Sequence, residues 1–157
     1  MEQLFKPELV KIVEQFDSKN DCLSYLVELL SDTGCLEYPD RFLAAVKGRE
    51  EIMSTGIGKG VAIPHARDLT VSSLRIALCR CKQGMEFDSL DKQPVHLIFM
   101  LAVPQHSNQA YMRILRALSE YLRIKENRDQ LLNQTKEEDL FHYAQQIEKI
   151  IRPGSAD

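Results

Sequence analysis

Apolar residues recur every three or four positions in several parts of the chain, which is the spacing of one face of an α-helix. Ser18 is placed to cap the first of these helices and Gly34 to end it. Pro39 opens a second helix, and Ser107 or Asn108 caps a third. The positions expected to be buried are Leu23, Leu26, Val27 and Leu30 in the first helix, Leu43, Ala44 and Val46 in the second, and Met112, Leu115, Leu118 and Leu122 in the third.

Further elements are predicted near the two ends of the sequence. Residues 4–17 read as an edge strand or a short helix. Residues 127–132 predict a short helix, and residues 135–138 have the order of a capping box that opens a final helix. That helix is expected to bury Leu140, Tyr143, Ala144, Ile147 and Ile151. We expect residues 152–157 to form a flexible tail.

Strand patterns occupy the middle of the chain. Residues 74–81 alternate, and Gly84 is expected to turn the chain after them. Residues 95–103 are nearly all apolar, as in a central strand that is covered on both faces. Residues 61–63 predict a short strand that ends at Pro64, and residues 54–60 have the composition of a flexible loop.

Helices that bracket three or more strands, one of them apolar on both faces, predict a sheet with helices on both sides. The expected fold class is therefore α/β or α+β. We expect a single domain over residues 1–157, with its core at about 4–150.

Composition narrows the function classes. Of 157 residues, 44% are hydrophobic and 27% charged, with a formal net charge of −3, which is ordinary for a globular protein. A general binder of nucleic acid or of acidic membranes needs a basic excess, which this chain lacks. The start of the chain has no signal-peptide pattern, and the longest apolar run, 97–103, is too short to span a bilayer. We expect a cytoplasmic protein with no membrane insertion and no nucleic-acid partner.

The four cysteines are Cys22, Cys35, Cys79 and Cys81. No pair has the CxxC spacing, and a cytoplasmic location implies free thiols. On a strand, Cys79 and Cys81 point to one face, so a zinc site with His65 or His96 is conceivable. Plain buried thiols are the favoured interpretation.

The chain has one glycine-rich segment, with Gly56, Gly58 and Gly60. A dinucleotide-binding GxGxxG would need glycine where Val61 stands, and the Lys-Ser or Lys-Thr of a P-loop is absent. Both nucleotide interpretations are rejected. The remaining interpretations are a loop whose backbone approaches another group closely, or a tight turn.

His65 is the sharpest candidate for chemistry. It follows Pro64 at the end of a predicted strand. A neutral imidazole is nucleophilic near cellular pH, and a phosphoryl group on a ring nitrogen remains transferable. Backbone N–H groups and Arg67 or Arg49 are candidates to hold the phosphoryl oxygens. From the Pro-His dipeptide alone, a structural histidine would be the better interpretation.

The residues around Pro64-His65 favour a functional histidine instead. Arg49-Glu50, the segment from Ser54 to Gly60 and the following Val61-Ala62-Ile63-Pro64-His65 closely resemble the active-site signature of phosphotransferase-system (PTS) EIIA domains. The resemblance is to the fructose/mannitol type, including its nitrogen-regulatory branch. It continues through Met85-Glu86-Phe87-Asp88, Gln93-Pro94-Val95 and the apolar strand that ends at Val103-Pro104, and covers almost the whole chain.

The resemblance implies a fold and a set of roles. The family fold is a mixed sheet sandwiched between helices. His65 matches the histidine that accepts phosphoryl from a small carrier protein, HPr or its nitrogen-branch relative, and Arg49 matches an arginine near it. Thr55, Gly58 and Gly60 match the loop that cradles the phosphoryl group. This chemistry requires no metal and no cofactor.

One position departs from the family pattern. Family members usually carry a second histidine seven residues after the proline that aligns with Pro104, and this chain has Tyr111 there. His106 would fill the role only if its loop were remodelled. A tyrosine hydroxyl can donate a hydrogen bond but does not titrate near neutral pH. We therefore expect phosphorylation of His65 to be retained and onward transfer to an EIIB domain to be impaired.

Three functions remain open from the sequence. The favoured one is a stand-alone EIIA-like phosphocarrier of the nitrogen-regulatory type, used mainly for signalling through regulatory target proteins. The second is a binding module in which phosphorylation only switches affinity or is lost; the expectation that 157 residues hold no fused EIIB or membrane domain motivates it. The third is a carrier that passes phosphoryl to a separate fructose- or mannitol-type EIIB. The sequence does not identify the His65 nitrogen that is phosphorylated.

Overall fold

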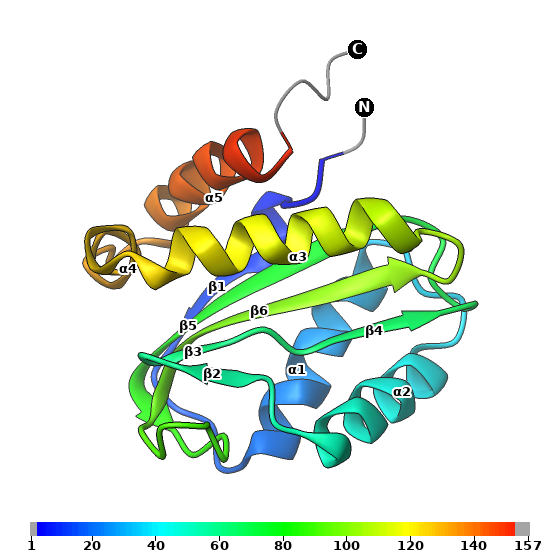
Figure 1. Ribbon diagram of the computed structural model, residues 1–157, viewed down its shortest axis with the longest axis horizontal. Helices are drawn as coiled ribbons and strands as arrows, with labels where there is room; N and C mark the ends of the chain where they lie inside the picture. Colours follow the sequence, from blue (N-terminus) through cyan, green and yellow to red (C-terminus); the bar gives the residue numbers. More distant parts are fainter. Residues whose placement is uncertain (1–2, 153–157) are drawn as a thin grey trace.

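The computed structural model describes residues 3–152, apart from the side chain of residue 108, and its centre is a mixed β-sheet. The strands are β1 (Val10–Val13), β2 (Gly56–Gly58), β3 (Val61–Ala62), β4 (His65–Asp68), β5 (Arg75–Met85) and β6 (Val95–Pro104). The helices are α1 (Lys19–Asp32), α2 (Pro39–Ile52), α3 (Asn108–Arg123), α4 (Lys125–Leu132) and α5 (Glu137–Ile151), with a 3₁₀ turn at Pro7–Leu9. Helices α1 and α2 lie on one side of the sheet, and α3, α4 and α5 on the other (Figure 1).

The strand order is β1-β5-β6-β3-β2, and β4 pairs with β6 further along. Strands β3 and β4 both run parallel to β6, with Val61 opposite Leu97 and His65 opposite Leu101. They are therefore two halves of one extended run, interrupted at Ile63 and Pro64. The Pro64 carbonyl accepts the Leu101 N–H at 2.9 Å, so this interruption stays attached to β6.

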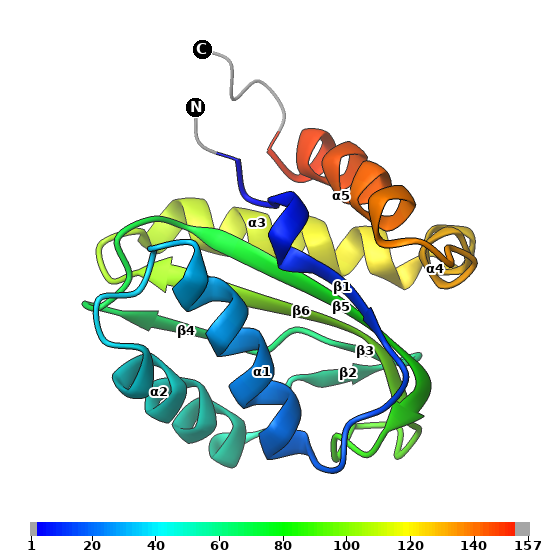
Figure 2. The ribbon, with the colours of Figure 1, turned by 180° about the vertical axis from the view of Figure 1, so that it is seen from behind.

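Two hydrophobic cores lie on the two faces of the sheet, and Figure 2 shows the face that α1 and α2 cover. Alternate residues of β6 divide between them: Ile98 and Met100 pack with α1 and α2, whereas Phe99 and Leu101 pack with α3 and α5. The expectation of a central strand covered on both faces is confirmed, because every residue of β6 except His96 is buried. The predicted fold class, a sheet between two helix layers, is confirmed as well.

Local signals at the N-terminal end of the chain are also confirmed. The Ser18 hydroxyl accepts the Asp21 N–H at 3.0 Å and caps α1, and Gly34 follows that helix with φ +83°. Residues 4–17 contain both expected elements, the 3₁₀ turn and the edge strand β1. The short helix near 127–132 is α4.

The expected buried faces of two helices are partly wrong. In α2, Ala44 is exposed, and the buried positions are Phe42, Val46 and Glu50. In α3, Met112 is half exposed and Ile114 is buried with Leu118 and Leu122. In each helix the apolar residues spread over two neighbouring faces, so their spacing alone does not decide which face packs against the sheet.

Three loop predictions are corrected. The segment expected to be a flexible loop contains strand β2, because glycine backbones pair with β3 without help from side chains. Gly84 does not turn the chain: it lies inside β5 with φ +78°, where the register with β6 shifts. The capping box at 135–138 does not form, because the N-cap of α5 is Lys136 and not Thr135, and it makes no side-chain cap hydrogen bond.

Among the described residues, no helix is long and apolar enough to cross a membrane. The expected tail at 152–157 lies, beyond Arg152, outside the described residues.

Candidate functional site

His65 is the first residue of β4, at the point where the β3–β4 run resumes after Pro64. Its partner across the ladder is Leu101, so its side chain projects from the sheet face that α3 covers. The side chain is half-buried. Arg67 follows two positions later and therefore points to the same face, but it is exposed.

The two nitrogens of the His65 ring have different surroundings. Nδ1 lies 2.8 Å from the Ile63 carbonyl oxygen. A carbonyl oxygen only accepts hydrogen bonds, so the geometry assigns the proton of the neutral ring to Nδ1. Nε2 then carries the free lone pair. The structure thus distinguishes two nitrogens that the sequence could not.

Burial lowers the pKa of the His65 imidazole below its ordinary value. The hydrogen bond to the Ile63 carbonyl opposes this shift, the positive charge of Arg49 adds to it, and the negative charge of Glu50 opposes it. The net effect favours the neutral, nucleophilic ring at neutral pH.

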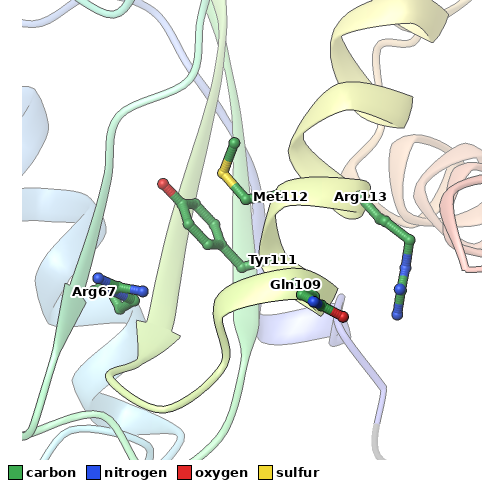
Figure 3. A pocket seen from close by; sticks show the side chains of 5 residues that line it. All are labelled: Arg67, Gln109, Tyr111, Met112 and Arg113. Carbon is green, nitrogen blue, oxygen red and sulfur yellow. The ribbon is translucent and has the colours of Figure 1, made fainter.

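Tyr111 lies beside His65. The two ring centroids are 6.0 Å apart, with the planes at 47°. Tyr111 comes from the first turn of α3 and its ring extends over β6, on the side of the helix where Arg67 lies, whereas Gln109 and Arg113 point away from Tyr111 (Figure 3). These residues and Met112 line an open depression of about 620 Å³; His65 does not line it, but its neighbour Tyr111 does. His106 is an exposed residue of the preceding loop.

The glycine segment turns tightly between β2 and β3. Gly58, Lys59 and Gly60 all have positive φ, at +99°, +59° and +78°. Asp91 holds this turn, because its carboxylate accepts the Lys59 N–H at 2.9 Å. Gly56 packs so closely that an added Cβ would lie 2.3 Å from the Ser89 hydroxyl. The sequence interpretation of a backbone that approaches another group closely is confirmed, and the neighbour is the 89–91 segment.

Arg49 and Thr55 reach the site from the end of α2 and the start of β2. The Arg49 guanidinium donates to the Met53 carbonyl at 2.7 Å, and its charge acts on His65. Thr55 is buried, and its hydroxyl donates to the Glu50 carboxylate. The structure therefore brings His65, Arg49, Thr55 and Tyr111 to one part of the sheet, between α2 and α3. Gly58 and Gly60 lie elsewhere: the Gly60 carbonyl accepts the N–H of Leu97, four residues before the His65 partner Leu101 in β6, and Gly58 packs against Asp91.

From the sequence, no role is predicted for Glu50, and Lys19 is not singled out. The Glu50 side chain is only 5% exposed and pairs with the Lys19 ammonium at 2.8 Å. One signal was present: Glu50 follows Phe42 and Val46 at intervals of four, which places it on the buried face of α2. Lys19 had no such signal, because its pairing depends on how α1 packs on α2.

The cysteines form no candidate centre. All four are buried and free. Burial raises the pKa of the Cys22 and Cys79 thiols far above their ordinary value, which disfavours the reactive thiolate. Within residues 3–152, no group of three or more histidine, cysteine or acidic side chains is placed to hold a metal ion.

Comparison with known families agrees with this geometry. The family model "Phosphoenolpyruvate-dependent sugar phosphotransferase system, EIIA 2" matches residues 3–147. A fructose-specific EIIA component from Haloferax volcanii is 35% identical over 125 residues, covering 80% of this chain and 81% of that protein. A fructose-specific EIIABC component from Bacillus subtilis is 34% identical over 147 residues; the match covers 94% of this chain but only 23% of that protein.

Regulatory relatives match too. A nitrogen regulatory protein from Pseudomonas aeruginosa is 36% identical over 93 residues, which is 59% of this chain and 60% of that protein. The crystal structure of the nitrogen regulatory protein IIA-Ntr from Neisseria meningitidis superimposes with a TM-score of 0.83 at 27% identity, over 89% of this chain and 95% of that one. The mannitol enzyme IIA in a complex with phosphorylated enzyme IIB from Escherichia coli, at 18% identity, shares the fold with a TM-score of 0.76, over 91% of this chain and 99% of that one.

Proposed function

The chain belongs to the EIIA 2 family of the phosphoenolpyruvate-dependent sugar phosphotransferase system, and on that premise we propose that His65 accepts a phosphoryl group from a phosphohistidine carrier protein. The donor is HPr or an HPr-like protein of the nitrogen branch, and the phosphorylated state serves mainly as a signal inside the cytoplasm. The proposal rests most directly on the ring of His65, whose Nδ1 is held by the Ile63 carbonyl at 2.8 Å while Nε2 is left to react.

Phosphoryl transfer between the two imidazole rings needs no additional proton. The Nε2 lone pair of His65 attacks the phosphorus of the donor phosphohistidine. A P–N bond forms to Nε2 as the donor P–N bond breaks, and the donor imidazole keeps the bonding electron pair. The His65 proton stays on Nδ1, where the Ile63 carbonyl stabilises the positive charge that the ring gains. The chain's contribution is to position the nucleophile and to place donors around the phosphoryl oxygens.

Several groups are assigned to the phosphoryl oxygens in this proposal. Arg49 supplies a positive charge next to the ring, and the Tyr111 hydroxyl supplies a neutral donor from the opposite side. The glycines at 58 and 60 permit the sharp turn that brings β2 alongside β3. The resemblance to the family also assigns Thr55 to this phosphoryl-binding loop.

Tyr111 also favours regulation over sugar transport. A tyrosine hydroxyl donates a hydrogen bond to the phosphoryl group but carries no positive charge, so it stabilises the charge of a departing phosphoryl group less than an imidazolium would. We therefore propose that transfer onward to an EIIB domain is slow and that regulatory targets read the phosphorylated state. Transfer to a fructose- or mannitol-type EIIB, and a binding role that needs no phosphorylation, are the two alternatives.

The test begins with intact mass. The purified chain is incubated with phosphoenolpyruvate, the first enzyme of the phosphotransferase system and HPr or its nitrogen-branch relative, alongside His65→Ala. The proposal predicts an acid-labile phosphoryl adduct that the variant lacks. Absence of an adduct with every competent carrier would leave only the binding role.

The readout of the signal is a second experiment. The phosphorylated and unphosphorylated proteins are immobilised and the partners they retain are compared. A partner set that differs between the two states supports signalling. Equal retention in both states, together with rapid transfer to a purified EIIB, would favour the transport alternative.

A further inference from the structure

An ion pair with a buried carboxylate and a partly buried ammonium joins three parts of the chain. Lys19, at the start of α1, places its ammonium 2.8 Å from a Glu50 carboxylate oxygen near the end of α2. Lys19 also donates to the Phe87 carbonyl at 3.3 Å and lies over the Phe87 ring, 4.5 Å from its centroid. The Glu50 carboxylate also accepts hydrogen bonds from Thr55.

Thr55 is held by Glu50 at two points. Its backbone N–H donates to one carboxylate oxygen at 3.1 Å, and its hydroxyl donates to the other. A hydroxyl has a single proton to donate. While that proton is given to Glu50, Thr55 has none left for a phosphoryl oxygen.

The path continues to the reactive ring. The Thr55 carbonyl accepts the Ile63 N–H at 3.0 Å, and the Ile63 carbonyl accepts the His65 Nδ1 proton at 2.8 Å. Lys19, Glu50, Thr55, Ile63 and His65 therefore form one continuous run of polar contacts. Its buried links place two charges in an environment where a fixed partner matters more than in water.

We propose that Glu50, neutralised and held by Lys19, is a positioning residue that fixes Thr55 and thereby the backbone that orients the His65 ring. This inference rests on the proposed phosphoryl acceptance by His65. It gives Thr55 a different task from the one that its family resemblance implies: its hydroxyl orders the loop and does not donate to the phosphoryl group.

A double-mutant cycle separates the two tasks. The variants are Glu50→Gln, Thr55→Val and the combination, and the readout is the rate of His65 phosphorylation by saturating phosphorylated carrier. Each single change should slow the reaction by about tenfold, which corresponds to losing one well-placed hydrogen bond. The carrier KM should stay within about twofold, because the docking surface is unchanged. The double variant should be no slower than either single one, since both break the same run.

Phosphoramidate serves as a second donor that needs no docking. The form protonated on nitrogen reacts: its P–N bond breaks, the bonding electron pair leaves with neutral ammonia, and the phosphoryl group bonds to Nε2 of His65. The same ranking of variants is expected with it. All rates are measured about two pH units above the ordinary imidazole pKa, so that a shifted His65 titration does not contribute.

Two controls are built into the chain. Thr55→Ser retains the hydroxyl and should react at close to the wild-type rate. Glu148→Gln alters a comparable carboxylate, which accepts the Phe5 N–H at 3.1 Å and pairs with Arg152 at 3.0 Å, but on the opposite face of the sheet. It should leave the rate unchanged. If Glu50→Gln fails to fold, the test uses other variants. The rate of Thr55→Val is then compared with that of Thr55→Ser, and Lys19→Met replaces Glu50→Gln.

The outcomes distinguish the two claims. Wild-type protein that takes phosphoryl from neither donor overturns the proposed function, and the positioning role with it. Wild-type protein that is phosphorylated while Glu50→Gln and Thr55→Val react within twofold of it overturns the positioning role alone. Effects that multiply in the double variant also overturn it, because they would mean that Thr55 acts on the phosphoryl group independently of Glu50.

Discussion

The imidazole of His65 and the phenol of Tyr111 face each other with their ring centroids 6.0 Å apart, one from the start of β4 and the other from the first turn of α3. Under the proposed function, Tyr111 is the neighbour assigned to donate to a phosphoryl group bonded to Nε2. The two residues therefore define the part of the site in which this chain departs from its family pattern.

Tyr111→Phe tests the hydroxyl without removing the ring. If the hydroxyl donates to the phosphoryl group, the phosphorylated protein should lose phosphoryl to water faster, and acceptance should slow by about threefold to tenfold. The measurement is the adduct lifetime by intact mass. Equal lifetimes for the two proteins would show that the phenol only packs against His65.

Tyr111→His tests the consequence for onward transfer. The imidazole can carry a positive charge toward a departing phosphoryl group, so we expect transfer to a purified fructose- or mannitol-type EIIB to accelerate by tenfold or more, by roughly the contribution of one charged donor. Acceptance from the carrier should change much less. An EIIB that discharges wild-type and variant protein at the same rate would contradict this account.

The pH dependence of the site follows from the lowered pKa of His65. Burial is its first cause, so the ring stays neutral to a lower pH than a free imidazole. Phosphoryl acceptance should then persist below pH 6.5, the ordinary pKa, and decline only as the ring becomes protonated. An NMR titration of the His65 ring protons measures this directly, and a pKa at or above the ordinary value would contradict it.

The same shift links the site to stability. The unfolded chain binds a proton on His65 at a higher pH than the folded chain does. The neutral ring therefore contributes stability above the unfolded pKa, and this contribution is lost as the pH falls through the folded pKa. Replacing His65 by glutamine should make the free energy of unfolding less sensitive to pH between about 7 and 5, as followed by denaturant titration.

Gly56 should not tolerate a side chain. An added Cβ would lie 2.3 Å from the Ser89 hydroxyl and 3.0 Å from its Cα, so Gly56→Ala should destabilise the fold by about 1–3 kcal/mol. Gly48 is the matched control, since a Cβ there meets nothing within 4 Å. Gly48→Ala, within α2, should stabilise by about 0.5–1 kcal/mol. Thermal unfolding of the two variants measures the contrast, and similar shifts in both would refute the close approach.

Removing Lys19 should reveal how much the buried pair contributes. Lys19→Met keeps an unbranched side chain of similar length but leaves the Glu50 carboxylate without its cation. We expect a loss of about 1–3 kcal/mol, below the range for a fully buried pair because the Lys19 side chain is 23% exposed. Lys19→Met/Glu50→Gln should lose less than the sum of the single changes. Additive losses in denaturant titrations would mean that the two groups do not interact.

The fold was largely accessible from the sequence because strong local signals agreed with one another. The Ser18 cap, the continuous apolar run of β6 and the apolar spacing of α5 each arise from residues close together in the chain. Strands β2 and β4 were missed because glycine and the polar His65–Asp68 segment carry no strand pattern. Their structure comes from pairing with distant strands.

The site was accessible only in part. The loop and His65 could be found because they form one contiguous string, and Tyr111 because it stands at a fixed distance from Pro104 in that family pattern. The pairing of Lys19 with Glu50 depends on the packing of α1 against α2, and the orientation of the His65 ring depends on the Ile63 carbonyl. No local sequence pattern encodes either contact.

The most direct test of the central claim is to identify the phosphorylated nitrogen of His65. The protein is labelled with ¹⁵N and phosphorylated through its carrier. Long-range ¹H–¹⁵N correlations of the His65 ring are then recorded. The geometry predicts phosphoryl on Nε2 and a proton on Nδ1, which the Ile63 carbonyl holds at 2.8 Å. Phosphoryl on Nδ1, or an adduct on any residue other than His65, would contradict the account.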